Sequence, residues 1–220
     1  MRIAAFITVL LLTHAAGLVA QAPAPPPVTV LQPDRVFDGE QNHAGWAVVV
    51  RGDRIEAAGP LASLTVPTGS RTIVLKGLTL MPGLIEGHSH LLLHPYNETL
   101  WENQVLREPL ALRVARATNH ARDTLMAGIT TTRDLGTEGA QYADVGLRDA
   151  INQGIIPGPR MLVAGPAMVV TGQYAPKGFA PEHPVAQGAE EADGLDGVVD
   201  RKSTRLNSSH VSESRMPSSA

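Results

Sequence analysis

Residues 84–165 alternate between short apolar runs and segments with a helical period, and this alternation constrains the fold more than any other feature of the chain. Strands are predicted at Leu84–His90, Ile129–Asp134 and Arg160–Gly165, with helices between them over residues 109–126 and 140–154. Strands and helices that alternate in this way form parallel sheets. The sequence therefore predicts an α/β fold whose ligand site lies beyond the C-terminal ends of its strands.

The two predicted helices rest on apolar residues spaced three and four positions apart, each followed by a glycine that can end the helix. The first helix ends before Gly128 and the second before Gly154. The expected apolar faces are Leu110, Val114, Ala117, Ala121 and Leu125 in the first helix, and Tyr142, Val145, Ala150 and Ile151 in the second. Each face should pack against the parallel sheet.

The chain begins with the pattern of an export signal. A basic residue, Arg2, precedes an apolar stretch of about ten residues, and small residues follow at positions 18–22. We therefore expect a signal peptide over residues 1–22, a Pro-rich extended linker over 23–27, and a periplasmic or secreted protein with no stable membrane anchor after cleavage. The sequence contains no Cys, so any metal must bind to His, carboxylate or modified Lys side chains.

Between residues 28 and 80 the pattern changes to short β-strands. Apolar runs on both sides of Gly52 and Asp53 predict a hairpin, and turn residues such as Pro33 and Gly39 separate the other runs. The Arg-Gly-Asp triplet at 51–53 is interpreted as this turn, because a tight hairpin needs such residues. We expect residues 28–80 to form a β-rich module of their own.

Two histidines stand at the end of the first predicted barrel strand, in the stretch "MPGLIEGHSH". Side chains alternate along a strand, so His88 and His90 should project to the same side while Ser89 points away. Two converging imidazoles can chelate a divalent metal, with Zn²⁺ as the expected ion and one or two ions bound. The alternative is that both histidines are solvated residues at a strand end.

Three stretches together resemble the amidohydrolase superfamily, in particular its imidazolonepropionase-related and prolidase-like branch. They are "MPGLIEGHSH", "MAGITTTRDLG" (126–136) and "LRDAINQGIIPGPRMLVAGP" (147–166). The resemblance implies a β-sandwich portion over residues 28–80, followed by a metal-dependent (β/α)8 barrel over 81–200. It also implies hydrolysis of a C–N bond in an amide, cyclic amide or dipeptide-like substrate by a metal-activated hydroxide. His88 and His90 would be ligands of the first metal.

Four further residues are candidates near that site, each with an alternative. Glu86 could be a buried acceptor beneath the metal or could pair with a basic neighbour. Asp134 could accept a hydrogen bond from a ligating histidine, or could form an ion pair or cap a helix. Thr171 and Tyr174 follow the third strand and could line the substrate pocket or belong to an ordinary loop. His94 and His120 have no motif spacing and are expected at the surface or on a helix.

The predicted barrel is incomplete at its C-terminus. Only three of the eight strands are expected, whereas a barrel typically needs about 250 residues. The Ser-rich residues 201–220 have no apolar periodicity and are expected to be a non-native or disordered tail. We therefore expect the chain to be a fragment that is inactive alone.

Charge and composition narrow the classes of partner. The net charge is −3 and there is no long basic stripe, which argues against nucleic acid and favours a small-molecule or short-peptide substrate. Two alternative functions stay open: a non-catalytic secreted binding module or relic, and a phosphoester hydrolase on the same barrel. The sequence leaves the oligomeric state open.

Overall fold

The computed structural model describes residues 26–180 and 182–201. The expected signal peptide over residues 1–22, most of the linker and the tail after residue 201 lie outside these described residues. The chain divides into two compact units, residues 1–82 and 83–220. Within the described ranges, no helix is long and apolar enough to cross a membrane.

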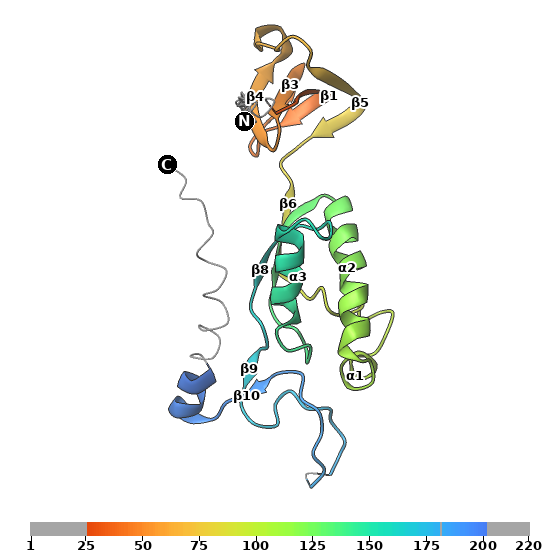
Figure 1. Ribbon diagram of the computed structural model, residues 1–220, viewed down its shortest axis with the longest axis vertical. Helices are drawn as coiled ribbons and strands as arrows, with labels where there is room; N and C mark the ends of the chain where they lie inside the picture. Colours follow the sequence, from red (N-terminus) through yellow and green to blue (C-terminus); the bar gives the residue numbers. More distant parts are fainter. Residues whose placement is uncertain (1–25, 181, 202–220) are drawn as a thin grey trace, which may run out of the picture. The chain divides into compact units, whose positions relative to one another are not determined.

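The N-terminal unit is a five-stranded mixed sheet (Figure 1). Its strands are β1 (Val28–Phe37), β2 (Asn42–Ala44), β3 (Trp46–Arg51), β4 (Arg54–Pro60) and β5 (Arg71–Leu80). Strand β1 pairs antiparallel with β2 and β3 and parallel with β5, while β3 pairs antiparallel with β4. A 3-10 helix, Leu61–Ser63, follows β4. The expected hairpin turn at Gly52 is present, and this glycine has a φ of 60°, a conformation that favours glycine.

A small apolar core stabilises this sheet. Val30, Ala47 and Val49 are buried, and Val28, Ala57 and Leu64 pack against them. The three buried residues come from adjacent strands, because β1 and β3 pair with Val30 opposite Val49. In the described residues this unit is therefore a single five-stranded sheet with a small core.

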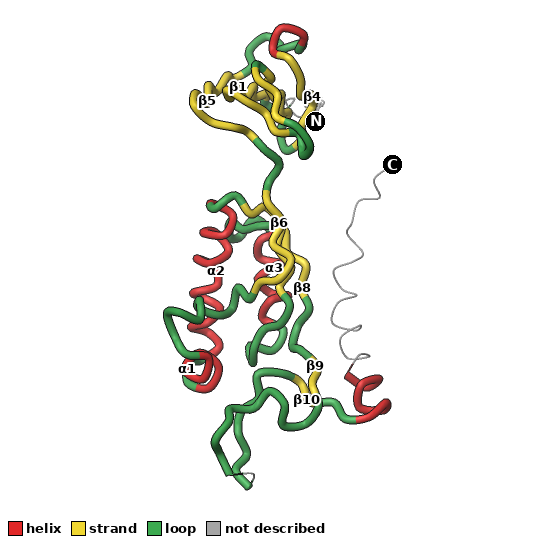
Figure 2. The backbone as a smooth tube through the Cα atoms, turned by 180° about the vertical axis from the view of Figure 1, so that it is seen from behind, coloured by secondary structure: helices red, strands yellow, loops and turns green. Residues whose placement is uncertain are grey.

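The C-terminal unit contains the predicted βαβαβ series (Figure 2). Its strands β6 (Leu84–Ser89), β7 (Ile129–Asp134) and β8 (Arg160–Val163) form a parallel sheet in the order β6-β7-β8. Helices α2 (Leu110–Met126) and α3 (Ala143–Asn152) connect these strands and lie side by side on one face of the sheet. Three short elements were not predicted: α1 (Trp101–Leu106), β9 (Met168–Val169) and β10 (Glu190–Glu191).

The core of this unit lies between the sheet and the two helices. It contains Leu91, Leu92, Ala117, Ala121, Ala140, Leu147 and Met161. Alanines at the centre of α2 let the helix approach the sheet closely, because Ala117 and Ala121 have no exposed area. The expected face of α2 is confirmed at its centre, but Leu110 in its first turn is 43% exposed. In α3 the buried apolar residue is Leu147, which is not part of the predicted face.

The helices cover only one face of the parallel sheet. In β8, Met161 is 4% exposed whereas its neighbour Leu162 is 54% exposed. Strands that are covered on both faces bury consecutive apolar residues, so this alternation marks a sheet with one open face in the described residues. The glycines expected to end the two helices are in place, since Gly128 and Gly154 both have positive φ.

The close packing of α2 gives a stability prediction. Ala121 is 0% exposed and belongs to the core between helix and sheet, so a larger side chain there would have to displace its neighbours. We expect Ala121→Leu to lower the free energy of unfolding by about 1–3 kcal/mol. The control is Ala115→Leu, the same change at an exposed position of the same helix. Urea denaturation that shows equal effects for both variants would contradict the packing.

Candidate metal centre

His88 and His90 lie together at the C-terminal end of β6. Their ring centroids are 5.2 Å apart and the ring planes meet at 68°. Ser89 between them points to the other side, where its hydroxyl is 2.6 Å from the Thr132 hydroxyl and donates to the Arg133 carbonyl oxygen at 3.2 Å. The strand alternation expected from the sequence is therefore present, and it brings the two imidazoles side by side.

A backbone carbonyl orients the His90 ring. His90 Nδ1 is 2.8 Å from the carbonyl oxygen of Gly136, which lies just beyond the end of β7. Because a carbonyl oxygen can only accept, Nδ1 must carry a proton, and in the neutral imidazole the lone pair is then on Nε2. A neutral imidazole held in this tautomer is suited to bind a metal through Nε2.

The expectation that Glu86 is a buried acceptor beneath the metal is wrong. Glu86 is exposed, and its carboxylate accepts a hydrogen bond of 2.9 Å from the backbone N–H of His88. The pairing with β7 shifts here, since Glu86 lies opposite Thr132 whereas Ser89 lies opposite Asp134. This bulge inserts one residue and interrupts the alternation on which the expectation depended. Glu86 instead fixes the backbone of the strand just before His88.

Asp134 is buried at the end of β7, but it does not bind a histidine directly. Its carboxylate oxygens accept backbone N–H groups, one from Leu91 at 3.0 Å and one from Gly136 at 3.3 Å. The expected hydrogen bond to a ligating histidine is therefore wrong, as are the alternatives of an ion pair and a helix cap. Asp134 affects His90 indirectly. It binds the backbone N–H of Leu91, which follows His90, and that of Gly136, whose carbonyl oxygen accepts the His90 hydrogen bond.

Burial also changes the acidity of Asp134. Loss of hydration raises its pKa from 3.8 to about 6, and the two backbone N–H donors and nearby His90 oppose this rise only in part. Asp144, also buried, contributes to the rise through its negative charge. Burying the charged form of Asp134 therefore costs free energy. Its hydrogen bonds to Leu91 and Gly136 stabilise the segments that follow β6 and β7.

Thr171 and Tyr174 do not lie in the same pocket as His90. The hydroxyl and the backbone N–H of Thr171 both donate to the Asp193 carboxylate, which makes Thr171 part of a loop closure. These hydrogen bonds, led by that of the Thr171 hydroxyl, lower the pKa of Asp193. Tyr174 donates to Glu138 at 2.6 Å and lies edge-on to Trp101. In the described residues Thr171 and Tyr174 thus join different loops, Thr171 to Asp193 and Tyr174 to Glu138.

Two pockets open near these loops. His90 lines one of about 370 Å³ whose wall also includes His94, Tyr96 and His120. Tyr174 lines a separate pocket of about 460 Å³ with Trp101 and Lys177. The rings of His94 and His120 are 6.1 Å apart, so the structure pairs two histidines that the sequence analysis left without partners.

Sequence reasoning also missed Glu138 and Trp101. Glu138 is 5% exposed, and its carboxylate accepts hydrogen bonds from the Trp101 indole at 2.8 Å and from Tyr174. These residues come from three separate loops or helix ends, and no local motif links them. The positive φ of Glu138, 50°, is likewise invisible in the sequence.

The described residues supply only part of a metal-binding shell. Within residues 26–180 and 182–201 there is no group of three or more His, Asp or Glu side chains that could hold an ion. His88 and His90 nevertheless fit a metal as two of its ligands, since their rings are adjacent and Nε2 of His90 carries a free lone pair.

Comparison with known protein sequences assigns the chain to a family. A sequence model described as the amidohydrolase family matches residues 79–217, which is more than half of the chain. The chain therefore belongs to the amidohydrolase family. No curated protein sequence matches it.

Solved structures of prolidases and amidohydrolases share the fold. A prolidase in complex with N-methylphosphonate-L-proline is 28% identical, with a TM-score of 0.65 over 83% of this chain and 44% of its own. An amidohydrolase is 27% identical, with a TM-score of 0.65 over 82% and 44% of the two chains. A Xaa-Pro dipeptidase with bound methionine, 24% identical with a TM-score of 0.68 over 83% and 45%, supports the fold alone. The chain thus spans less than half the length of these relatives.

The raised pKa of Asp134 gives a pH-dependent prediction. The folded protein keeps the Asp134 proton up to about pH 6, whereas the unfolded chain releases it near pH 4. The resulting stabilisation is complete below about pH 4 and is lost as the pH rises through about 6. Asp134→Asn cannot titrate, so the parent's advantage over this variant in unfolding free energy should fall by about 2–3 kcal/mol from pH 4 to pH 7. Urea denaturation at the two pH values measures it, and a constant or growing advantage would contradict the assignment.

Proposed function

We propose that this chain is part of a metal-dependent hydrolase that cleaves C–N bonds in small amide or dipeptide-like molecules. The observation that carries the proposal is the pair of adjacent imidazoles, His88 and His90, at the C-terminal end of the first parallel strand. Catalytic and ligand-binding groups in parallel α/β folds lie at this edge of the sheet. Membership of the amidohydrolase family supports the same reaction class.

A divalent metal at this position would supply Lewis acidity to polarise the scissile carbonyl and would lower the pKa of a bound water. The chain's own contribution is to hold the ligands. His90 presents Nε2 because the Gly136 carbonyl holds the proton on Nδ1. Zn²⁺ is the ion we propose first, because imidazole nitrogen suits it and the sequence offers no thiolate.

The substrate class rests on a relative and on the dimensions of the pockets. The 28% identical prolidase was solved with a phosphonate analogue that contains L-proline. The two pockets here, about 370 and 460 Å³, fall within the usual range for small-molecule sites. We therefore place a dipeptide-like or related small amide as the substrate, with specificity set by the loops after the parallel strands.

Export belongs to the same proposal. The basic residue, apolar stretch and small residues within positions 1–22 have the pattern of a signal peptide. A hydrolase of small peptides or amides in the periplasm or outside the cell would act on material taken from the surroundings. The net charge of −3 gives no support for a nucleic-acid substrate.

Metal binding by the histidine pair is directly measurable. We expect the untagged chain to bind Zn²⁺ in isothermal titration calorimetry, and His88→Ala or His90→Ala to weaken the affinity at least about tenfold because each removes one nitrogen ligand. His183→Ala is the control, since His183 is an exposed loop residue. Unchanged Zn²⁺ affinity in both strand-end variants, or an equal loss in His183→Ala, would contradict the site.

A further inference from the structure

The segment that follows His90 is held in place by side chains at successive residues. The Leu91 N–H donates to Asp134, and the Leu91 carbonyl accepts from His120 Nδ1 at 2.9 Å. The Leu92 carbonyl accepts from Arg113 Nε at 3.1 Å. Ordinary surface loops do not have this density of side-chain anchors, because most of their backbone groups bind water.

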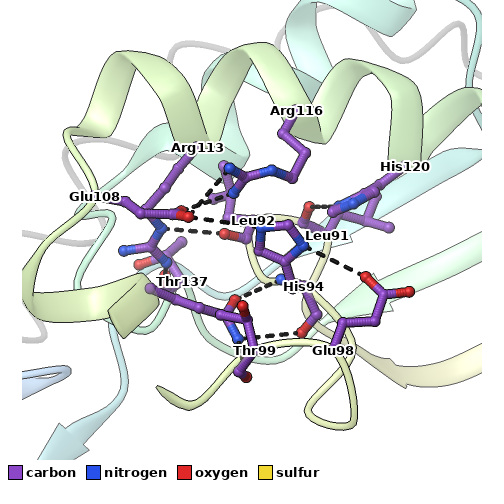
Figure 3. A network of polar contacts seen from close by, with 11 residues as sticks. Leu91, Leu92, His94, Glu98, Thr99, Glu108, Arg113, Arg116, His120 and Thr137 are labelled. Atoms are coloured by element: carbon purple, nitrogen blue, oxygen red, sulfur yellow. Dashed lines mark hydrogen bonds and ion pairs between the residues drawn. The ribbon is translucent and has the colours of Figure 1, made fainter. Parts of the chain in front are cut away.

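Two of these anchors come from one face of α2 (Figure 3). Arg113 and His120 are seven residues apart, which is two helical turns, so both side chains project toward the same segment. Arg113 makes a second contact, from Nη2 to the Thr137 carbonyl at 2.9 Å. Its guanidinium therefore connects the loop after β6 with the loop after β7.

The residues that Arg113 connects are close in sequence to the candidate metal centre. Leu92 is two residues after His90, and Thr137 directly follows Gly136, whose carbonyl orients the His90 ring. Movement of either loop would change the distance between His90 Nδ1 and its acceptor. Arg113 thus fixes both ends of that hydrogen bond through the backbone.

Arg113 is also in an unusual environment for a charged residue. It is 2% exposed, and burial lowers its pKa despite the opposing charges of Glu108 and Glu138. Burying a guanidinium costs free energy unless its donors are satisfied. A purely apolar residue at this helix position would pack in the core without that cost, and what the buried guanidinium adds is its hydrogen bonds to two loop carbonyls.

We propose that Arg113, assisted by His120, is a positioning residue that holds His90 in its Nδ1–H tautomer and in the orientation needed to bind a metal. This inference rests on the proposed function for its metal-binding part, whereas the tautomer of His90 can be observed without any metal. Neither residue is a metal ligand in this proposal, although His120 also lines the pocket that His90 lines. Their effect is transmitted through the carbonyls of Leu91, Leu92 and Thr137.

The test compares three substitutions at Arg113 and Arg116. Arg113→Met keeps the length of the side chain and removes all donors, while Arg113→Lys keeps a charge and a donor. Arg116→Met is the matched control, because Arg116 lies on the same helix and, among the residues that the structure describes, forms its hydrogen bonds with Glu108 alone, in a bidentate contact. His120→Phe keeps an aromatic ring but removes the donor to the Leu91 carbonyl, so it tests the second anchor, and we expect a change in the same direction as in Arg113→Met.

Two measurements are made on each folded variant of the complete 220-residue chain. Long-range ¹H–¹⁵N NMR of the metal-free protein identifies which His90 nitrogen carries the proton, and titration with Co²⁺ followed by visible absorption gives the affinity and the ligand environment. We expect the parent and Arg116→Met to show Nδ1–H at His90 and equal Co²⁺ affinity. Arg113→Met should show a mixture of tautomers and about tenfold or greater loss of Co²⁺ affinity, with Arg113→Lys between them.

Two results would overturn the positioning role. The first is an Arg113→Met protein that is folded by circular dichroism yet keeps the parent's His90 tautomer and Co²⁺ affinity. The second, if Arg113→Met does not fold, is the same lack of change in both Arg113→Lys and His120→Phe. A parent chain that binds no Co²⁺ would contradict the proposed function instead, and the NMR comparison would then decide the positioning role by itself.

Discussion

The hydrogen bonds of the buried Asp134 carboxylate are the interaction on which the candidate centre depends. This carboxylate holds the N–H groups of Leu91 and Gly136, and so it fixes the segments that leave β6 and β7 relative to one another. The hydrogen bond from the His90 imidazole to the Gly136 carbonyl joins the same two segments. Without Asp134, the strand ends would still pair along the sheet, but the segments just beyond them would lose one of the two buried side chains that join them, the other being Arg113.

The same strategy recurs at the next strand. Asp144 at the start of α3 is fully buried, and its carboxylate accepts the Gly165 N–H at 2.7 Å, just beyond β8. Burial raises the pKa of Asp144 as it does for Asp134. Buried carboxylates bound to backbone N–H groups are therefore used twice to hold strand ends, and these hydrogen bonds offset part of the cost of burying them. A metal site at this edge of the sheet benefits from such rigidity, because its ligands must keep their positions and orientations relative to one another.

Much of the fold follows from periodicity, and the sequence therefore predicts it. The spacing of apolar residues predicts α2 and α3, and the period of two along a strand predicts that His88 and His90 project together. The same rule fails for Glu86, because a bulge in the pairing of β6 with β7 is a tertiary feature with no local signal. Asp134 is a candidate site residue from its place at the end of a predicted strand. Its partners cannot be predicted from the sequence, because they are backbone N–H groups, which nearly every residue has.

The remaining features depend on contacts between distant segments. Glu138 binds Trp101 and Tyr174 across separations of 37 and 36 residues, and Arg113 binds carbonyl groups rather than recognisable side chains. Arg113 stands beside predicted core residues in the sequence of the helix, and its charge at that position is the one sequence feature that points to a special role. From the sequence alone an arginine there is interpreted as a surface residue, because the two loops that it connects are known only from the structure.

If the candidate centre is a metal site, His88 and His90 bind one divalent metal through imidazole nitrogen. X-ray absorption spectroscopy of the Zn²⁺-loaded chain detects such ligands, because imidazole rings produce characteristic scattering from their outer atoms. We expect two imidazole ligands with Zn–N distances of about 2.0–2.1 Å, completed by oxygen ligands. A shell made only of oxygen, with no imidazole scattering, would contradict it.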